Sequence, residues 1–179
     1  KTVPVSSSVH YIAGVNYDMG NYLFSIEGYF KKISNLTEFS TRYKPGLGGI
    51  KYEENYYHGE GYSKGLEFLA QKKTGSLNGW ISYTLGEAKS KFEIYGNNYY
   101  PSSQDVTHEF KTVLIYRLGR FDFSATWIYA TGRPYTAPEG AYSVTLLDGT
   151  EQEYYTVSDK NSLRLPAYHR MDLAASFRL

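Results

Sequence analysis

The sequence predicts an all-β fold, an antiparallel up-and-down meander of about seven long strands. Apolar and polar residues alternate with period two along these segments, most of which are about ten to twelve residues long. Short turns and long loops alternate between the segments. The 20 Tyr, 9 Phe and 2 Trp among 179 residues also favour strands, because aromatic side chains fit a pleated surface. We therefore expect one architectural unit over residues 1–179.

The alternation is clearest in the segments at residues 121–130 and 168–179. In the first, Phe123 and Trp127 lie on the opposite face from Ser124, because successive side chains of a strand point to opposite sides. The other segments follow the same rule with a few exceptions. The seven predicted strands are residues 10–17, 22–36, 62–73, 77–88, 108–118, 121–130 and 168–179.

Tight turns and long loops alternate strictly along the chain. The turns are residues 18–21, 74–76 and 119–120, each with a glycine that suits a hairpin. The long loops are residues 37–61, 88–107 and 131–167. This order places every long loop at one rim and every tight turn at the other, which is the layout of an outer-membrane β-barrel. Strands of about ten residues can cross a bilayer at a tilt, whereas no apolar run approaches the roughly 18 residues of a membrane helix.

Seven strands do not close into a single-chain outer-membrane barrel, because such barrels have even strand numbers from 8 upward. An open sheet would leave two edges of unpaired backbone groups in hydrocarbon. Since the chain begins in a loop and stops at Leu179 on the tight-turn rim, we expect it to be part of a larger barrel. The alternative is a small non-transporting outer-membrane barrel, or a binding or structural protein, completed by one more strand or by self-association.

Several stretches point to a known family, and their order covers almost the whole chain. They are residues 8–14, 29–36, 61–67, 80–85, 108–113, Ala130-Thr-Gly-Arg-Pro-Tyr-Thr136 and Leu165-Pro-Ala-Tyr-His-Arg-Met-Asp-Leu173. Together they resemble the barrel of TonB-dependent outer-membrane receptors, particularly the carboxypeptidase-regulatory-like type that includes the SusC-like importers. The resemblance implies a 22-strand barrel with an N-terminal plug. By that resemblance this chain is a C-terminal part of the barrel that lacks the plug and the last strands.

The resemblance also implies the function and partners of the whole protein. The chain would supply barrel wall and extracellular loops to a transporter in the bacterial outer membrane that imports a nutrient or metal chelate. Its partners would be outer-membrane lipid, the TonB complex through the plug, a surface lipoprotein, and an imported small molecule, glycan or peptide. The net charge of +1 argues against nucleic acid as a partner. We expect no cofactor, no metal and no catalytic residue.

Two groups of residues are candidates for function. Exposed tyrosines of the long loops could stack on a ligand and hydrogen-bond to it. The candidate ligand-binding tyrosines are Tyr56, Tyr57, Tyr95, Tyr99, Tyr100 and Tyr135. Charged residues on one face of the fifth and seventh strands would point into the lumen, where charge is tolerated. The predicted lumen-facing residues are Glu109, Lys111, Arg117, Arg170, Asp172 and Arg178.

Two chemical alternatives have weaker support. Gly61-Tyr-Ser63-Lys-Gly65 matches the G-x-S-x-G of serine hydrolases, and Asp105 or Asp159 followed by His169 would give the triad order. The preceding segment is polar, however, and a nucleophile elbow follows a buried apolar strand. A second candidate is a divalent-metal site at Glu53, Glu54, His58 and Glu60, although a solvated acidic loop explains the same residues.

Overall fold

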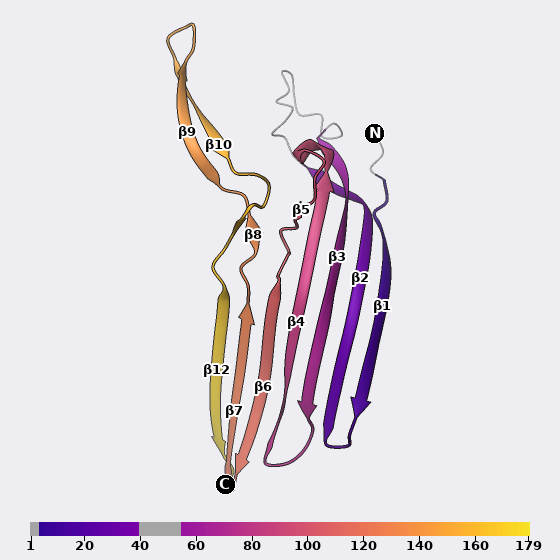
Figure 1. Cartoon of the computed structure of the whole chain (residues 1–179). Coiled ribbons are helices and arrows are strands. Elements are labelled where there is room, and N and C mark those ends of the chain that lie inside the picture. Colours follow the sequence, from indigo (N-terminus) through magenta and orange to yellow (C-terminus); the bar gives the residue numbers. More distant parts are fainter. Residues whose placement is uncertain (1–3, 40–54) are drawn as a thin grey trace.

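A computed structural model describes residues 4–39 and 55–179 of the chain. Seven long strands form one antiparallel sheet (Figure 1). They are β1 (Ser7–Asp18), β2 (Tyr22–Phe39), β3 (Tyr56–Lys72), β4 (Leu77–Phe92), β6 (His108–Leu118), β7 (Phe121–Ala130) and β12 (Tyr168–Phe177). Each strand pairs with its neighbour along this series, so the order in the sheet is β1-β2-β3-β4-β6-β7-β12. The predicted all-β antiparallel meander is thereby confirmed.

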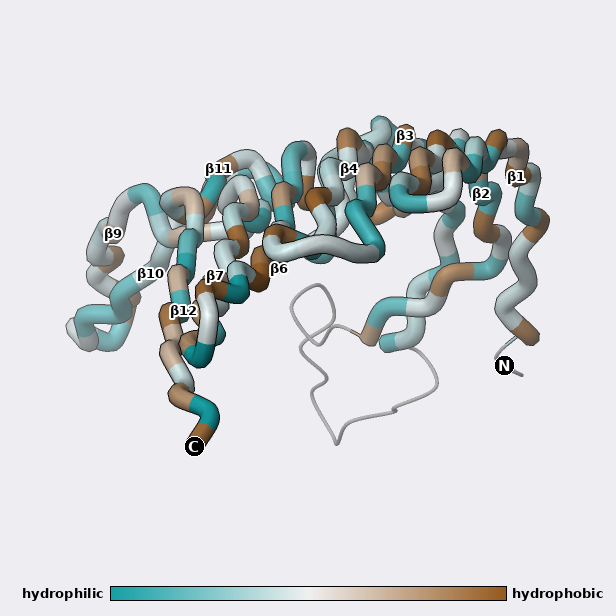
Figure 2. The backbone as a smooth tube through the Cα atoms, turned by 90° about the horizontal axis from the view of Figure 1, so that it is seen from below, coloured by the Kyte–Doolittle hydropathy of each residue, from teal (hydrophilic) through white to brown (hydrophobic). Residues whose placement is uncertain are grey.

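The sheet is open and curved. Figure 2 shows it end-on as an arc whose two outer strands, β1 and β12, bend toward the same side. Within the described residues each of these two strands has a neighbour on one side alone. Figure 1 places the tight turns at one end of the sheet and the long connections at the other. The described part of the chain contains no helix long and apolar enough to cross a membrane.

The strands of the first half are longer than their sequence patterns predict. β2 continues to Phe39 and β3 begins at Tyr56, whereas alternation suggested residues 22–36 and 62–73. The pairing continues through a bulge at Ser34–Leu36, where one extra residue shifts the register. A bulge interrupts the period-two pattern, and this interruption is why the pattern stopped short of the true strand end.

Two of the long loops contain structure of their own. The loop over residues 131–167 includes β9 (Pro138–Thr145) and β10 (Glu151–Val157), which form a hairpin that projects beyond the sheet (Figure 1). Its base is a short ladder of β8 (Pro134–Tyr135) and β11 (Leu163–Arg164). The loop over residues 88–107 contains the 3-10 turn η2 (Glu93–Tyr95) and β5 (Tyr100–Pro101), which pairs with β4.

The two faces of the sheet differ in chemistry, and the register defines them. One face, here called the apolar face, carries large hydrophobic side chains along every strand, and all of the following are at least 39% exposed. They are Val15, Tyr17, Phe24, Ile26, Phe68, Ile81, Leu114, Phe123, Trp127 and Leu173. Among the described residues, Phe92 is the one large hydrophobic side chain that is buried. In water each exposed apolar Å² costs about 25 cal/mol, so this face requires another apolar phase to cover it.

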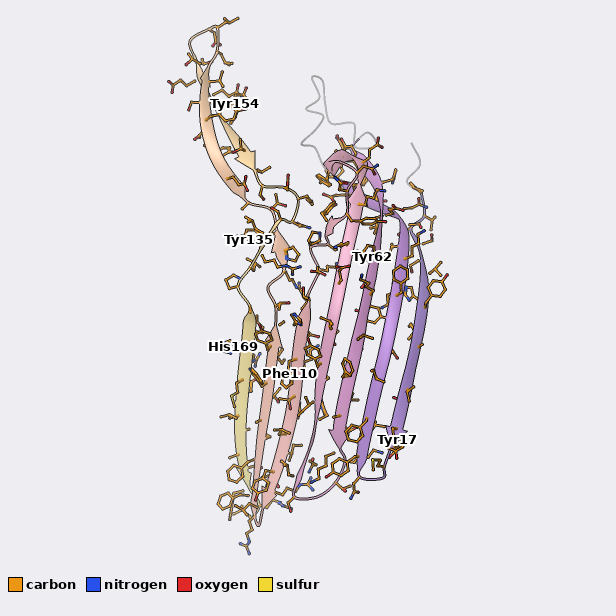
Figure 3. All side chains as sticks on the ribbon, in the orientation of Figure 1. Tyr17, Tyr62, Phe110, Tyr135, Tyr154 and His169 are labelled. Atoms are coloured by element: carbon orange, nitrogen blue, oxygen red, sulfur yellow. The ribbon has the colours of Figure 1, made fainter. Side chains whose placement is uncertain are left out.

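The opposite surface, here called the polar face, is lined by charged and small residues. Figure 3 shows how side chains leave both sides of the strands, with Tyr17 near the tight-turn end and Tyr62 nearer the loop end. On the polar face the Tyr29 ring lies over Gly65, where an added Cβ would come within 2.7 Å of its hydroxyl oxygen. Glycine at this position therefore lets an aromatic ring lie flat against the backbone.

Candidate ligand site at the loop end of the polar face

The loop ends of β2, β3 and β4 bring side chains together on the polar face. Glu38 of β2 is paired with Tyr57 of β3, and the next row of the same face, two residues closer to the tight turns, pairs Gly59 with Phe92. Gly59 is required there, because an added Cβ would lie 2.7 Å from the Phe92 ring. This floor of Glu38, Tyr57 and Phe92 is the base of the candidate site.

Tyr95 connects the three long loops above this floor. It ends the η2 turn, which Gly96 closes in a left-handed conformation at φ 91°. The Tyr95 hydroxyl donates a hydrogen bond to Oε1 of Glu38. Lys160, from the third loop, donates from Nζ to the same carboxylate oxygen at 2.7 Å and lies 4.8 Å from the centre of the Tyr95 ring. A carboxylate, a phenol and an ammonium group thus form one cluster.

Tyr100 extends this cluster with a second phenol. Its ring packs edge-on against Tyr95, with 5.5 Å between the ring centres. Burial raises the pKa of Tyr100 above its usual value, and the negative charge of Glu38 raises it further. Tyr100 is therefore a neutral hydroxyl donor at any physiological pH.

Buried polar contacts hold the third loop against the second. Asp105 is 3% exposed, accepts a hydrogen bond from the backbone N–H of Ala88 at 2.6 Å, and is ion-paired with Arg164. Asn161 is also buried, and its side chain donates to the carbonyl of Pro101 at 2.8 Å. These contacts explain how Lys160, next to Asn161, reaches a carboxylate 122 residues away in the sequence.

The structure divides the six tyrosines that the sequence singled out. Tyr57, Tyr95 and Tyr100 come together at the cluster described above. Tyr56 lies on the apolar face, where the centre of its ring is 5.3 Å from the centre of the Phe39 ring. Tyr99 is also on that side, because it bonds Glu60 and contacts Tyr62. Tyr135 lies apart on β8 (Figure 3).

The charged residues predicted to face a lumen all share the polar face. Lys111, Ile128 and Arg170 form one row across β6, β7 and β12, and Glu109 and Asp172 follow the same alternation. Several are paired along their own strand, since Lys111 bonds Glu109 at 2.6 Å and Arg170 bonds Asp172 at 2.9 Å. At the tight-turn end, the other two arginines of the set contact Asp122; they are Arg117 at 3.7 Å and Arg178 at 3.1 Å.

The two chemical alternatives find no geometric support. Ser63 lies inside β3, where it pairs with Lys31 on one side and Ala88 on the other, so it does not occupy a strand-to-helix turn. Of the acidic loop, Glu53 and Glu54 lie outside the described residues. Within the residues that are described, no three His, Asp or Glu side chains come together as a possible metal site.

Comparison with known proteins decides the family. A family model described as "TonB dependent receptor-like, beta-barrel" matches residues 7–179. The chain belongs to the TonB-dependent receptor β-barrel family. Proteins of this family are receptors of the bacterial outer membrane, not a class of enzymes. No curated protein matches the sequence.

A solved receptor supports the same fold. The ferripyoverdine receptor of the outer membrane of Pseudomonas aeruginosa, in a crystal structure with ferripyoverdine bound, matches with a TM-score of 0.63 and 14% identity. The match covers all of this chain and 22% of that receptor. The TonB-dependent receptor segment described here is thus about a fifth of the length of the receptor that it resembles.

Glu38 and Lys160 are the functional candidates that sequence reasoning missed. Glu38 fell in the predicted loop 37–61, because the bulge hid the continuation of β2. Lys160 sits in a polar stretch with no motif around it. The one available signal was Gly96 next to a Tyr-rich segment, which marks a turn but does not indicate which residues it faces.

Proposed function

We propose that this chain is a barrel-wall and extracellular-loop segment of a TonB-dependent transporter that imports a nutrient or metal chelate. The observation that carries the proposal is the contrast between the two faces: a continuous exposed apolar face, and a polar face of paired charges. In an outer-membrane barrel the first lies against lipid and the second lines the interior. The open edges at β1 and β12 fit a sheet that further strands complete.

The apolar band has the height that this role needs. On β4 it runs from Leu77 to Leu85, eight residue steps or about 26 Å along the strand. A tilt of about 40° reduces that to about 20 Å of membrane depth, close to the roughly 25 Å apolar band of outer-membrane barrels. Beyond Leu85 the same face turns polar at Glu87. We infer a barrel of the 22-strand type, whose lumen is plugged, of which the seven strands are about a third.

We assign ligand capture to the cluster of Glu38, Tyr57, Tyr95, Tyr100 and Lys160. It lies at the loop end of the polar face, where a molecule entering the lumen would pass. Phenols offer stacking surface and hydrogen bonds, and Lys160 supplies an ammonium group whose charge Glu38 balances in the unliganded cluster. This set suits a ligand with hydroxyl and acidic groups, such as a siderophore or a glycan. The SusC-like subtype, the plug, the TonB contact and a surface lipoprotein partner belong to the same proposal.

The face assignment is tested by cysteine labelling of the complete receptor in outer-membrane vesicles. Leu173→Cys should react with a membrane-soluble maleimide and resist a charged one, whereas the neighbouring Asp172→Cys should show the reverse. Equal labelling of both positions by the charged reagent would contradict the proposal.

Transport itself is tested by growth on candidate iron chelates and glycans. Growth on the imported compound should require both this receptor and an intact TonB protein. A protein that binds the compound while growth on that compound is unchanged by its deletion would instead indicate the non-transporting alternative.

A further inference from the structure

Above the apolar band, the apolar face carries a cluster of lysines on β2, β3 and β4. Lys32 and Lys89 flank Tyr62 in one row of the sheet, and Lys64 and Glu87 are paired in the row below. Lys91 stands opposite Glu60 in the row above. Four lysines against two glutamates leave an excess of two positive charges on this patch. A surface for lipid tails would carry no such excess unless it met negative charge.

The ion pairs of the patch are surface pairs and leave the ammonium groups accessible. Lys64 and Lys89 both contact Glu87 at 3.2 Å, so one carboxylate serves two lysines. The Lys64 side chain remains 54% exposed. Lys32 forms no ion pair within the part of the chain that is described. The Tyr62 hydroxyl donates a third contact to Glu87 at 2.8 Å.

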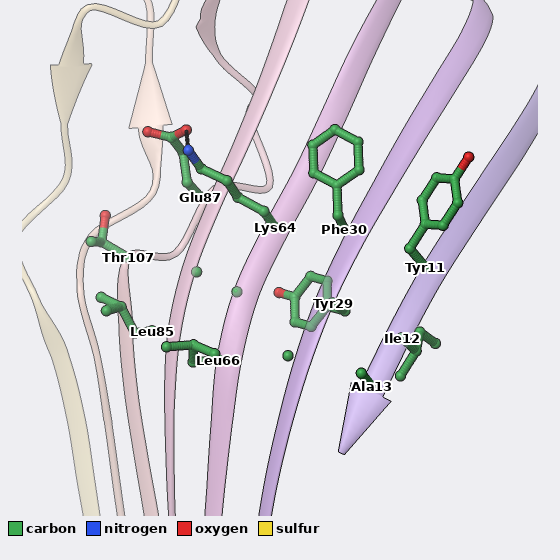
Figure 4. A pocket seen from close by; sticks show the side chains of 13 residues that line it. Tyr11, Ile12, Ala13, Tyr29, Phe30, Lys64, Leu66, Leu85, Glu87 and Thr107 are labelled. Atoms are coloured by element: carbon green, nitrogen blue, oxygen red, sulfur yellow. Dashed lines mark ion pairs between the residues drawn. The ribbon is translucent and has the colours of Figure 1, made fainter.

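Directly below the lysines the face is hollowed into an apolar groove of about 690 Å³. The floor of the groove is formed by two small residues, Ala13 and Gly28. Leu66 and Leu85 lie in the same row of the sheet and continue the floor across β3 and β4. Figure 4 shows the groove residues with the Lys64–Glu87 ion pair at the loop-side end. The groove is therefore open to an extended hydrocarbon chain, and the Lys64–Glu87 ion pair stands at its loop-side end.

We propose that this groove and the lysine patch above it bind one membrane lipid with an anionic phosphate headgroup. An acyl chain would lie over Gly28 and Ala13, and the phosphate would contact Lys32, Lys64 and Lys89. The lysine patch lies on the loop side of the apolar groove, as a phosphate headgroup lies beyond its acyl chains. Lysine side chains can also lay their methylene groups along the apolar surface while their ammonium groups reach the headgroup. The inference rests on the proposed membrane orientation and adds a specific lipid to it.

The test is native mass spectrometry of the complete detergent-purified receptor, incubated with phosphatidylglycerol or with phosphatidylcholine of the same acyl chains. Wild-type receptor should retain phosphatidylglycerol at an approximately tenfold lower lipid concentration. The double variant Lys32→Gln/Lys64→Gln should lose that preference. Gly28→Leu, which fills the groove floor, should weaken retention of both lipids.

A matched control lies on the opposite face. Lys31→Gln/Lys111→Gln also removes one lysine that has no ion pair among the described residues and one paired with a glutamate, since Lys111 bonds Glu109. This variant should retain phosphatidylglycerol as the wild type does. Correct folding of each variant is established beforehand by the heat-dependent gel mobility of folded barrels.

Three results would overturn the lipid site. They are equal retention of the two lipids by the wild type, equal losses in the two double variants, and full displacement of phosphatidylglycerol by millimolar inorganic phosphate. The last would indicate a simple anion site. Loss of lipid in the Lys31→Gln/Lys111→Gln variant alone would reverse the faces and overturn the proposed orientation as well. If growth assays show no import while the lipid preference holds, the transport proposal fails and the lipid site stands.

Discussion

Arginine placed on either face of β6 should have very different costs. Leu114 and Val113 are adjacent in the middle of β6, yet Leu114 belongs to the apolar face, between Gly79 and Ala125, and Val113 to the polar face. At mid-depth an arginine on the lipid side costs about 2–4 kcal/mol. Leu114→Arg should therefore reduce the folding equilibrium constant by a factor of roughly 30 to 900.

The cost of Val113→Arg follows from its row in the sheet. That row continues to Thr126 and then to Asp172, so an arginine there meets hydroxyl and carboxylate groups. We expect a change below about 1 kcal/mol, the usual range for a solvated surface substitution. The two substitutions introduce the same side chain one residue apart, so the difference between them isolates the environment of the face.

The assay is reversible guanidinium unfolding of the complete receptor in phospholipid vesicles, followed by tryptophan fluorescence. Leu114→Lys, with a different cation, should give a loss of similar size. Equal losses for Leu114→Arg and Val113→Arg, or a larger loss for Val113→Arg, would refute the assignment of the faces.

Three further changes test the backbone, the loops and the ligand site. Gly79→Ala should destabilise the barrel by about 3 kcal/mol in the same unfolding assay, because Gly79 has a φ of 145° and an added Cβ would collide with the carbonyl oxygen of Val113. Arg164→Ala should cost about 2 kcal/mol by leaving the buried Asp105 carboxylate without its cation, and should speed proteolysis of the third loop; unchanged cleavage would argue against this anchor. Lys160→Met should weaken capture of an acidic ligand at least tenfold in a titration, whereas equal affinity would remove this lysine from the site.

The sheet could be predicted from the sequence because each of its faces has one kind of surroundings, apolar or polar. Side chains along a strand then alternate in polarity with period two. In β7, the face that carries Phe123 and Trp127 contains no charged side chain, and the predicted bounds of the strand agree with the structure. The loop end of β2 could not be predicted in the same way. A bulge at Asn35, with φ 56°, shifts the register and breaks the pattern before the strand ends.

The candidate site was predictable only in part, and the reason is physical. Tyrosine content pointed to the loops that form the candidate cluster, but alternation decides which face each residue occupies. Tyr57 is the strand partner of Glu38 and shares its face, while the adjacent Tyr56 belongs to the other face. The contact of Glu38 with Lys160 depends on the buried pair of Asp105 and Arg164, which brings distant loops together. No local pattern encodes such a contact.

The self-contained ladders of the third loop have a consequence for how such proteins can diversify. β8 and β11 close this loop at its base, and among the described strands β9 and β10 pair with each other and with no third strand. β7 and β12 pair with each other in one continuous register, and this pairing does not involve the third loop that joins them. The third loop can therefore be shortened, lengthened or replaced as a unit while the strands of the barrel sheet keep their register. Ligand recognition by this loop can then change between related receptors while the sheet that carries the loop stays the same.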